Sequence, residues 1–159
     1  MITYYSAGLS PLIDNMEELL YKLVEDETEM KKALEIRKKV FVEEQGISSD
    51  LDLDGNDSDA LHVIVKKLDE PVGTVRIRFL TTQQAKLERM AIMKPSRGSG
   101  IGRQVITFLE KELKTRGIEQ IVLHAQHNSI DFYNKCGFKS TSLPFLEAGI
   151  RHVSMEKDI

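Results

Sequence analysis

The chain has 159 residues, of which 41% are hydrophobic and 30% charged, and its formal net charge is −3 at pH 7. This length predicts a single domain over residues 1–159, and the charge argues against a nucleic-acid-binding surface, which needs a basic excess. No apolar run approaches the roughly 20 residues of a membrane span, and the start lacks a secretory signal. Cys136, the only cysteine, excludes an intrachain disulfide, favours the cytoplasm and is expected to be a small buried hydrophobe.

The first predicted element follows an N-terminal arm over residues 1–19, which contains few residues typical of a core. Residues 21–26 alternate in polarity, as a short strand does. Asp26 and Glu29 then have the spacing of a capping box, and the apolar stripe that follows predicts a helix to about residue 43.

Three predicted strands occupy the middle of the chain, after a polar loop over residues 44–59. They are joined by short turns and cover residues 61–68, 72–80 and 85–93. Connections this short favour an antiparallel meander.

A glycine-rich loop follows the third strand and leads into an amphipathic helix over about 100–116. Residues 119–125 are nearly all apolar, which is typical of a strand buried on both faces and parallel to a neighbour. A short helix at 128–135 and strands at 138–142 and 150–157 complete the chain. The pattern predicts an α+β fold with a mixed, mainly antiparallel sheet and helices on both faces.

Gly98, Gly100 and Gly102 stand at alternate positions in the loop before the helix. The first turn of a helix leaves N–H groups without partners, and its dipole favours an anion there. Glycines allow a diphosphate to approach the backbone, and three nearby side chains add positive charge: Lys94, Arg97 and Arg103. A Walker loop is excluded because no Lys-Ser or Lys-Thr pair follows these glycines, and the dinucleotide fingerprint lacks its last glycine. A plain glycine-rich turn remains the alternative.

Two motifs in the expected order resemble those of the GCN5-related N-acetyltransferase (GNAT) family. The loop reads Arg97-x-x-Gly100-x-Gly102, similar to the acyl-CoA diphosphate signature, and "FYNKCGF" (132–138) is similar to a late F-Y-x-K-x-G-F segment. "LERMAI", just before the loop, resembles the central splayed strand of the family. The resemblance covers roughly residues 21–157. Four further segments resemble a bacterial subgroup of small, mostly uncharacterised members: "VFVEEQG" (40–46), "LHVIV" (61–65), "HAQ" (124–126) and "EAGIRH" (147–152).

The resemblance implies acetyl-CoA as co-substrate, no metal, and a pantetheine arm that lies along the strand 85–93. Many members have an Asn seven residues before the family tyrosine, where this chain has Gln126. The residues that the resemblance implies for binding acetyl-CoA are Met90, Ala91, Ile92, Arg97, Gly98, Ser99, Gly100, Ile101, Gly102, Arg103, Gln126, Phe132 and Lys135.

Direct attack of an amine on the acetyl thioester needs a general acid and a general base. The resemblance gives Tyr133 as the acid for the departing thiolate. For the base, Glu88 occupies a position where many members have a carboxylate, on the strand face that alternation assigns also to Met90 and Ile92; in a structural role it pairs with Arg89 or a neighbouring strand. His152 is the rival, because imidazole suits proton transfer near neutral pH.

His62 and His124 lie on predicted apolar strands, so both are expected in the core and not at the site.

The segment 43–59 contains seven acidic residues and no basic one. Residues 50–61 begin like an EF-hand loop, but Leu61 stands where the bidentate Glu belongs, so a solvated loop is the default. The resemblance places this segment beside the acceptor side of the cleft. A cationic acceptor, such as a polyamine, an amino sugar or a lysine side chain, is therefore a hypothesis.

The sequence is thus identified as an N-acetyltransferase that moves the acetyl group from acetyl-CoA to a primary amine in a ternary complex. The alternative is a non-catalytic acyl-CoA-binding or regulatory module. The expected partner is a small-molecule amine or a lysine-type acceptor, without nucleic acid or membrane, and a homodimer is compatible with the sequence.

Overall fold

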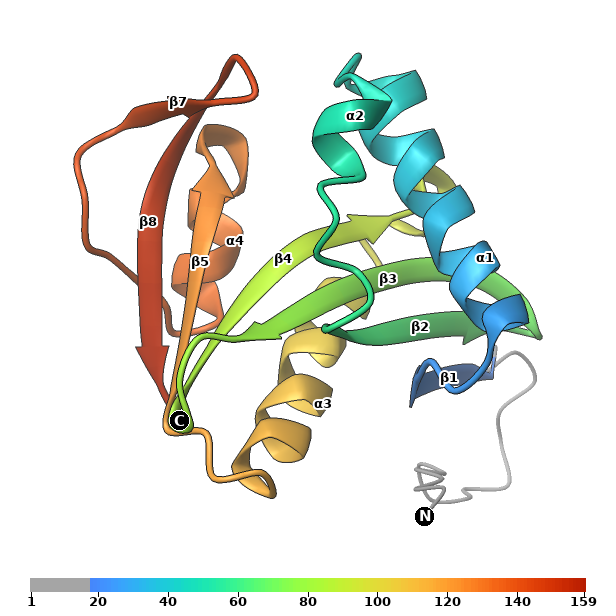
Figure 1. The fold of residues 1–159 in the computed structure, drawn as a ribbon, viewed down its shortest axis with the longest axis horizontal. Helices are drawn as coiled ribbons and strands as arrows, with labels where there is room; N and C mark the ends of the chain where they lie inside the picture. Colours follow the sequence, from blue (N-terminus) through green and yellow to red (C-terminus); the bar gives the residue numbers. More distant parts are fainter. Residues whose placement is uncertain (1–17) are drawn as a thin grey trace.

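The structure of the protein is a computed structural model that describes residues 18–159. Most of the arm predicted over 1–19 therefore lies outside the described residues, and Leu19 belongs to the first strand and not to an arm. The described strands form one eight-stranded sheet in the order β1-β2-β3-β4-β5-β8-β6, with β7 paired to β8. Helices cover both faces (Figure 1), so the predicted α+β fold with a mixed, mainly antiparallel sheet is confirmed.

The helix α1 (Glu27–Arg37) begins at the predicted capping box. The Asp26 carboxylate accepts a hydrogen bond of 2.8 Å from the Glu29 N–H. The Glu29 carboxylate in turn accepts one of 3.1 Å from the Glu25 N–H, one residue before the donor that a capping box normally uses. The two N–H groups bound by these carboxylates, of Glu25 and Glu29, flank the first residue of α1, so the cap fixes where the helix begins.

Three local differences separate the N-terminal part from the prediction. The first strand, β1 (Leu19–Leu23), lies earlier than the predicted 21–26. The helix predicted to residue 43 does continue there, but as a π-helical segment, η1 (Lys38–Glu44). The loop predicted over 44–59 contains a short helix, α2 (Ser49–Asp52).

The three central strands are confirmed with small shifts at their ends, and they pair antiparallel in chain order: β2 (Leu61–Lys67), β3 (Glu70–Phe79) and β4 (Gln84–Ile92). In their register Arg76 pairs with Glu88 and Thr74 pairs with Ala91, so β4 contains one extra residue in this interval. Arg89 has a φ of 54°, which marks the bulge.

The remaining elements are η2 (Lys94–Ser96), α3 (Ile101–Lys114), β5 (Gln120–Gln126), η3 (His127–Ser129), α4 (Ile130–Lys135), β6 (Lys139–Ser140), β7 (Phe145–Glu147) and β8 (Ile150–Asp158). β7 is the strand that the sequence did not predict. It forms a hairpin with β8.

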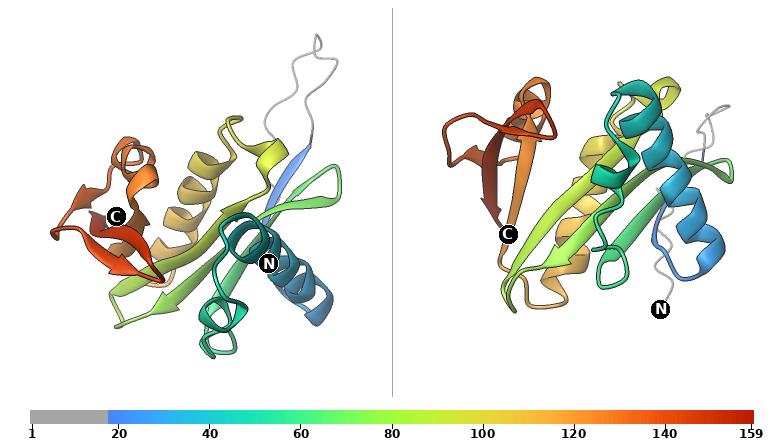
Figure 2. Two further views of the ribbon diagram at one scale, coloured as in Figure 1. Left: turned by 90° about the horizontal axis from the view of Figure 1, so that it is seen from above. Right: turned by 45° about the horizontal axis from the view of Figure 1, so that its top comes forward.

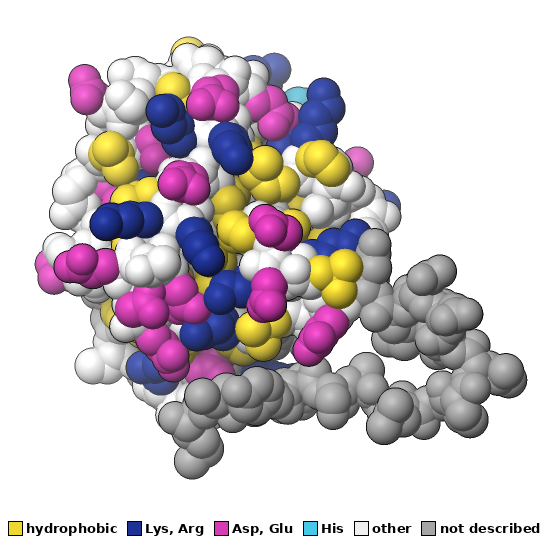
Figure 3. All heavy atoms as spheres, turned by 90° about the vertical axis from the view of Figure 1, so that its right-hand side faces the viewer, with side chains coloured by type: hydrophobic (Ala, Val, Ile, Leu, Met, Phe, Trp, Pro, Cys, Tyr) yellow, Lys and Arg dark blue, Asp and Glu magenta, His cyan; other side chains and the backbone are white. Residues whose placement is uncertain are grey.

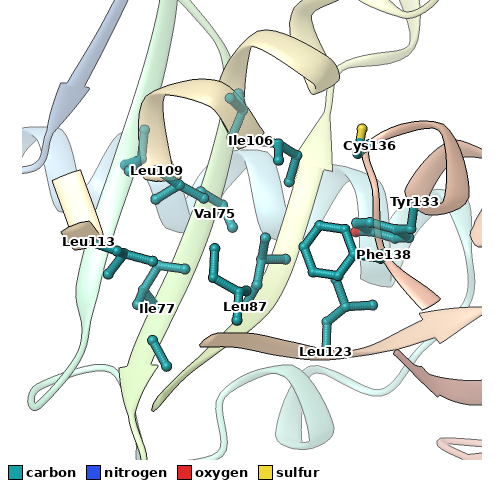
Figure 4. Packing of buried hydrophobic residues seen from close by; sticks show 14 of the residues in the cluster. Val75, Ile77, Leu87, Ile106, Leu109, Leu113, Leu123, Tyr133, Cys136 and Phe138 are labelled. Carbon is teal, nitrogen blue, oxygen red and sulfur yellow. The ribbon is translucent and has the colours of Figure 1, made fainter. Parts of the chain in front are cut away.

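The main core lies between α3 and the sheet, where the apolar stripe of the helix packs on β3 and β4. Figure 4 shows this packing for Ile106, Leu109 and Leu113 against Val75, Ile77 and Leu87. Cys136 is buried in the same core, as expected, and burial raises the pKa of its thiol.

The parallel pairing predicted for the strand at 119–125 is confirmed, but it is short. Gln84–Leu87 of β4 pair with Gln120–Leu123 of β5, and pairing between the two strands stops there. Beyond this point β4 stays with β3, and β5 stays with β8. The sheet therefore opens into two arms, which diverge in Figure 1 and in the view from above in Figure 2.

The face over α1 carries acidic and basic side chains interspersed with apolar ones (Figure 3), and no single sign dominates it. Within residues 18–159, no helix is long and apolar enough to cross a membrane.

The cap of α1 leads to a stability prediction. Asp26→Ala removes the acceptor of the Glu29 N–H and is expected to lower the free energy of unfolding by about 1 kcal/mol, measured by urea denaturation. Asp26→Asn keeps a side-chain acceptor and serves as the matched control. Equal losses in both variants would contradict the capping role.

Candidate active site

A pocket of about 470 Å³ lies between the two arms, in the range usual for small-ligand sites. One wall is apolar and comes from the segment after α1, with Phe41, Ile47 and Leu51. The opposite wall comes from β5, α4 and the β7–β8 hairpin. Five of the predicted site residues line the pocket together: Glu88, Met90, Gln126, Tyr133 and His152.

The bulge in β4 changes which side chains reach the pocket. Alternation predicted Glu88, Met90 and Ile92 on one face. Because Arg89 is the extra residue, Glu88, Arg89 and Met90 line the pocket in succession, and Ile92 does not. The predicted common face was wrong for Glu88: Met90 and Ile92 both pack against the main core, and the bulge at Arg89 puts Glu88 out of step with them.

Tyr133 projects from α4 towards β4 (Figure 4) and is 9% exposed. Its ring makes edge contacts with Phe132 and Phe138, and its hydroxyl lies 3.7 Å from the Met90 sulfur. Burial raises the pKa of the Tyr133 phenol. The phenol is therefore protonated at neutral pH and is held where it can donate a hydrogen bond at the edge of β4.

Glu88 is bound from the neighbouring strand. Arg76, which is 0% exposed, donates two hydrogen bonds to its Oε2, at 2.7 Å and 3.1 Å. Burial alone would raise the pKa of Glu88, but the bonds and charge of Arg76 outweigh it and lower the pKa. A carboxylate stabilised in this way accepts a proton poorly.

The polar end of the pocket contains two histidines around one carboxylate. His124 Nδ1 lies 3.0 Å from Glu147 Oε1, and His152 Nε2 lies 3.7 Å from Glu147 Oε2. His152 Nδ1 lies 2.8 Å from the Ile150 carbonyl oxygen, which can only accept, so Nδ1 carries the proton. Nε2 of the neutral ring is then the acceptor.

The two histidines that were expected in the core differ from each other. His62 is buried, as expected, with Nε2 bonded to the Asp57 carbonyl oxygen at 2.9 Å. The prediction for His124 was wrong, because it is exposed and lines the pocket. The apolar pattern suggested burial on both faces of β5, but His124 lies on the face that borders the pocket, where Phe145 and Glu147 cover it only in part.

The acidic loop is not simply solvated. Three of its carboxylates form ion pairs with arginines of α1, β3 and β4. Arg37 pairs with Asp52 and Asp57, Arg76 pairs with Asp54 and Asp57, and Arg89 pairs with Asp52 and Asp54. The Arg76 hydrogen bonds lower the pKa of Asp54. Much of the negative charge counted in the sequence is therefore neutralised. Among residues 18–159, no group of three His, Cys, Asp or Glu side chains is arranged to hold a metal ion.

The glycine loop ends in an open helix start. Gly100 precedes α3 with a φ of 84°, and no side chain caps the helix. The first helical hydrogen bond runs from the Gln104 N–H to the Gly100 carbonyl at 3.1 Å, so the N–H groups of residues 101–103 have no acceptor within the helix. A Cβ at Gly98 or Gly100 would meet no atom within 4 Å. The backbone is thus open to an anion, which fits the diphosphate of acetyl-CoA.

Gly102 has a different role from the one its spacing suggested. A Cβ there would lie 3.0 Å from the Phe132 ring and 3.4 Å from Met90 Cε. The missing side chain therefore lets the start of α3 approach α4 and β4. Ile101 beside it is a core residue, and Ala91 packs towards Ile36 and Phe41, so both can contribute only backbone groups to a ligand.

Arg97 is already bound to protein atoms. Its Nε donates to the Ile92 carbonyl at 2.9 Å, and its two Nη groups donate to Glu44 at 2.6 Å and 2.9 Å. The Arg97 hydrogen bond lowers the pKa of Glu44. Arg103 and Lys135 are exposed and form no ion pair with an acid of residues 18–159.

Sequence reasoning missed several residues of this site. Gln126 Nε2 donates a hydrogen bond of 2.9 Å to the amide oxygen of Gln45, and this bond joins the end of η1 to β5. Glu147 and Ala148 come from the unpredicted hairpin. The segments "VFVEEQG" and "EAGIRH" contain these three residues and resemble segments of the bacterial subgroup, but the resemblance assigned no role to any of the three.

Comparison with known proteins agrees with this geometry. The family model of the acetyltransferase (GNAT) domain matches residues 21–159. The uncharacterised protein YyaT of Bacillus subtilis is 38% identical over 141 residues, covering 87% of this chain and 95% of its own. The uncharacterised N-acetyltransferase YjcF of the same organism is 34% identical over 137 residues, covering 86% and 97%.

Solved structures give the same result. A candidate N-acetyltransferase of Lactobacillus plantarum is similar with a TM-score of 0.83 and 30% identity, covering 88% of this chain and 97% of its own. An acetyltransferase of Bacillus subtilis in complex with CoA has a TM-score of 0.69 and 18% identity, covering 89% and 99%. The second likeness concerns the fold alone.

The matching family model and the similar relatives define the class of this protein as acetyltransferases. The chain belongs to the GNAT acetyltransferase family. It is an acyltransferase that depends on acetyl-CoA.

The Arg97–Glu44 pair leads to a binding prediction. Because Glu44 competes with a diphosphate for Arg97, Glu44→Gln is expected to tighten CoA binding roughly two- to five-fold, measured as Kd by calorimetry at low salt. Glu43→Gln removes the same charge from the neighbouring exposed position and is the control. An equal gain in both variants would contradict a specific competition and indicate general charge repulsion.

Proposed function

We propose that this acyltransferase moves the acetyl group of acetyl-CoA to a primary amine by direct attack in a ternary complex. The observation that carries the proposal is that one pocket holds the Tyr133 hydroxyl, at the edge of β4, together with the free Nε2 of His152. An acid and a base thus face the same space. As predicted from the sequence, we take the chain as one N-acetyltransferase domain.

Binding of acetyl-CoA is assigned to two backbone regions. The N–H groups at the start of α3 bind the diphosphate, with Arg97, Ser99 and Arg103 around it. The backbone of β4 after Leu87 is not paired with β5, which supports its use by the amide groups of the pantetheine arm. Gln126 is assigned to the same arm, and it would then exchange its bond to Gln45 for the ligand.

The proton balance follows from the two side chains. The acceptor enters as an ammonium and passes one proton to His152, which returns it to solvent. The freed amine forms a C–N bond at the thioester carbonyl carbon as the C–S bond breaks. The departing sulfur gains a proton from Tyr133. The second nitrogen proton leaves as the amide forms and passes through solvent to the Tyr133 phenolate, which restores the phenol.

His152 is preferred to Glu88 as the base. Nε2 of His152 faces the pocket with a free lone pair, whereas Glu88 accepts two hydrogen bonds from Arg76, which lower its pKa. We assign Glu88 the role of holding Arg76 and the wall of the pocket. The sequence analysis left two roles open for Glu88, the base and a partner in an ion pair, and we assign it the second.

The direct test of the function is a thiol-release screen with acetyl-CoA and a panel of primary amines. Membership of the GNAT family gives acyl transfer as the general reaction, and the screen identifies the acceptor. Release of CoA thiol that depends on the amine supports the proposal. Thiol release equal with and without every amine would contradict it.

Tyr133→Phe removes the proposed acid without altering the ring packing. We expect kcat to fall about 10²-fold, with little change in KM for acetyl-CoA, because the lost interaction belongs to the transition state. Tyr21→Phe is the matched control, since the Tyr21 hydroxyl bonds Gln104, a residue outside the pocket. An unchanged kcat in Tyr133→Phe would exclude the phenol from proton transfer.

His152→Gln and Glu88→Gln separate the two bases through the pH profile of kcat/KM for the amine. A base must be unprotonated, so activity falls as the pH drops through its pKa. His152→Gln is expected to remove the acidic limb of the profile and to lower kcat/KM about 10²-fold. Glu88→Gln is expected to keep the limb. The opposite pattern would make Glu88 the base.

A further inference from the structure

The carboxylates of the pocket differ in what already binds them. Asp52, Asp54 and Glu88 each accept bonds from at least one arginine. Glu147 is the one carboxylate among the described lining residues without a lysine or arginine partner. It is also 48% exposed, so a ligand can reach it from solvent.

His124 holds one oxygen of this carboxylate. The Glu147 Oε1 atom is 3.0 Å from His124 Nδ1, and an ionised carboxylate can only accept, so His124 Nδ1 donates. The Phe145 ring lies between the two histidines, with centroids 5.0 Å from His124 and 6.1 Å from His152. These contacts limit the movement of the carboxylate and leave Oε2 directed towards His152.

The hairpin tip adds to this rigidity. Glu147 and Ile150 form its last pair, so the turn consists of Ala148 and Gly149 alone. Both have positive φ, 50° and 74°, as in a type I′ turn. Alanine rarely adopts this conformation, and Ala148 lines the pocket with Glu147.

When the His152 ring is neutral, two hydrogen-bond acceptors face each other at this point. Glu147 Oε2 and His152 Nε2 are 3.7 Å apart, and the bond from Nδ1 to Ile150 makes Nε2 an acceptor in the neutral ring. Two acceptors cannot bond to each other. A primary ammonium has three N–H donors and can lie at hydrogen-bond distance, about 2.9 Å, from both atoms.

We propose that Glu147, held by His124, binds the ammonium group of the acceptor beside His152, so that the acceptors of this enzyme are alkylamines protonated at neutral pH. The assignment rests on the proposed function and names its substrate class. Glu147 binds the charged amine, and His152 takes its proton. Neutral arylamines lack the charge that Glu147 recognises.

The test uses benzylamine, which is charged at pH 7.5, and aniline, which is neutral. Binding of each to the complex of the protein with CoA is measured by calorimetry, and thiol release is measured with acetyl-CoA. Glu147→Gln is expected to weaken benzylamine binding roughly 10- to 100-fold, the range for a lost charge-assisted hydrogen bond, with the CoA Kd unchanged. Glu147→Asp restores part of the affinity, and Glu35→Gln, at an exposed position of α1, behaves as wild type.

Three binding results would overturn the inference: undiminished benzylamine binding in Glu147→Gln, aniline bound by wild type as tightly as benzylamine, or an equal loss of CoA affinity. Benzylamine turnover that is unchanged in Glu147→Gln contradicts the inference and supports the proposed function. Benzylamine binding that depends on Glu147, without release of thiol, supports the inference and contradicts the proposed function. The two failures are therefore distinct.

Discussion

The early end of the parallel pairing between β4 and β5 is the constraint on which the site depends. After Leu87 and Leu123 each strand keeps only its antiparallel partner, so the two strands turn apart. The core under α3 holds the base of this opening, where Leu87 and Leu123 are buried. The pocket, the Tyr133 hydroxyl and the unpaired edge of β4 all follow from this separation.

The helix start and the pocket form one unit because small residues and a bulge bring their elements together. Gly102 lets α3 approach Phe132, and Phe132 packs on Tyr133. The bulge at Arg89 turns that side chain towards Asp52 and Asp54, which closes the acidic loop over the opposite wall. The proposed diphosphate site and the proposed acid are therefore connected through a few packed side chains.

The sequence predicted the elements whose signals are local. The Asp26 cap, the central strands and the glycine loop each have a short pattern, and the two family motifs contain Tyr133, which lines the pocket, and the loop that precedes α3. Bulges and ion pairs depend on partners that are distant in sequence. Arg89 carries no signal for a positive φ, and the acids of residues 52–57 meet arginines from three other elements. The exposure of His124 likewise depends on a hairpin too short to be recognised as a strand.

The buried Arg76 restricts how this scaffold can be adapted to other substrates. It binds Glu88 in the pocket and also Asp54 and Asp57 in the loop, and removing one partner of such a buried network typically costs about 3–5 kcal/mol. The charged part of the loop therefore has little freedom to vary. Leu51 lines the pocket, is 53% exposed and takes no part in the network through its side chain. It is therefore a position where substitutions can change the shape of the pocket without breaking the network.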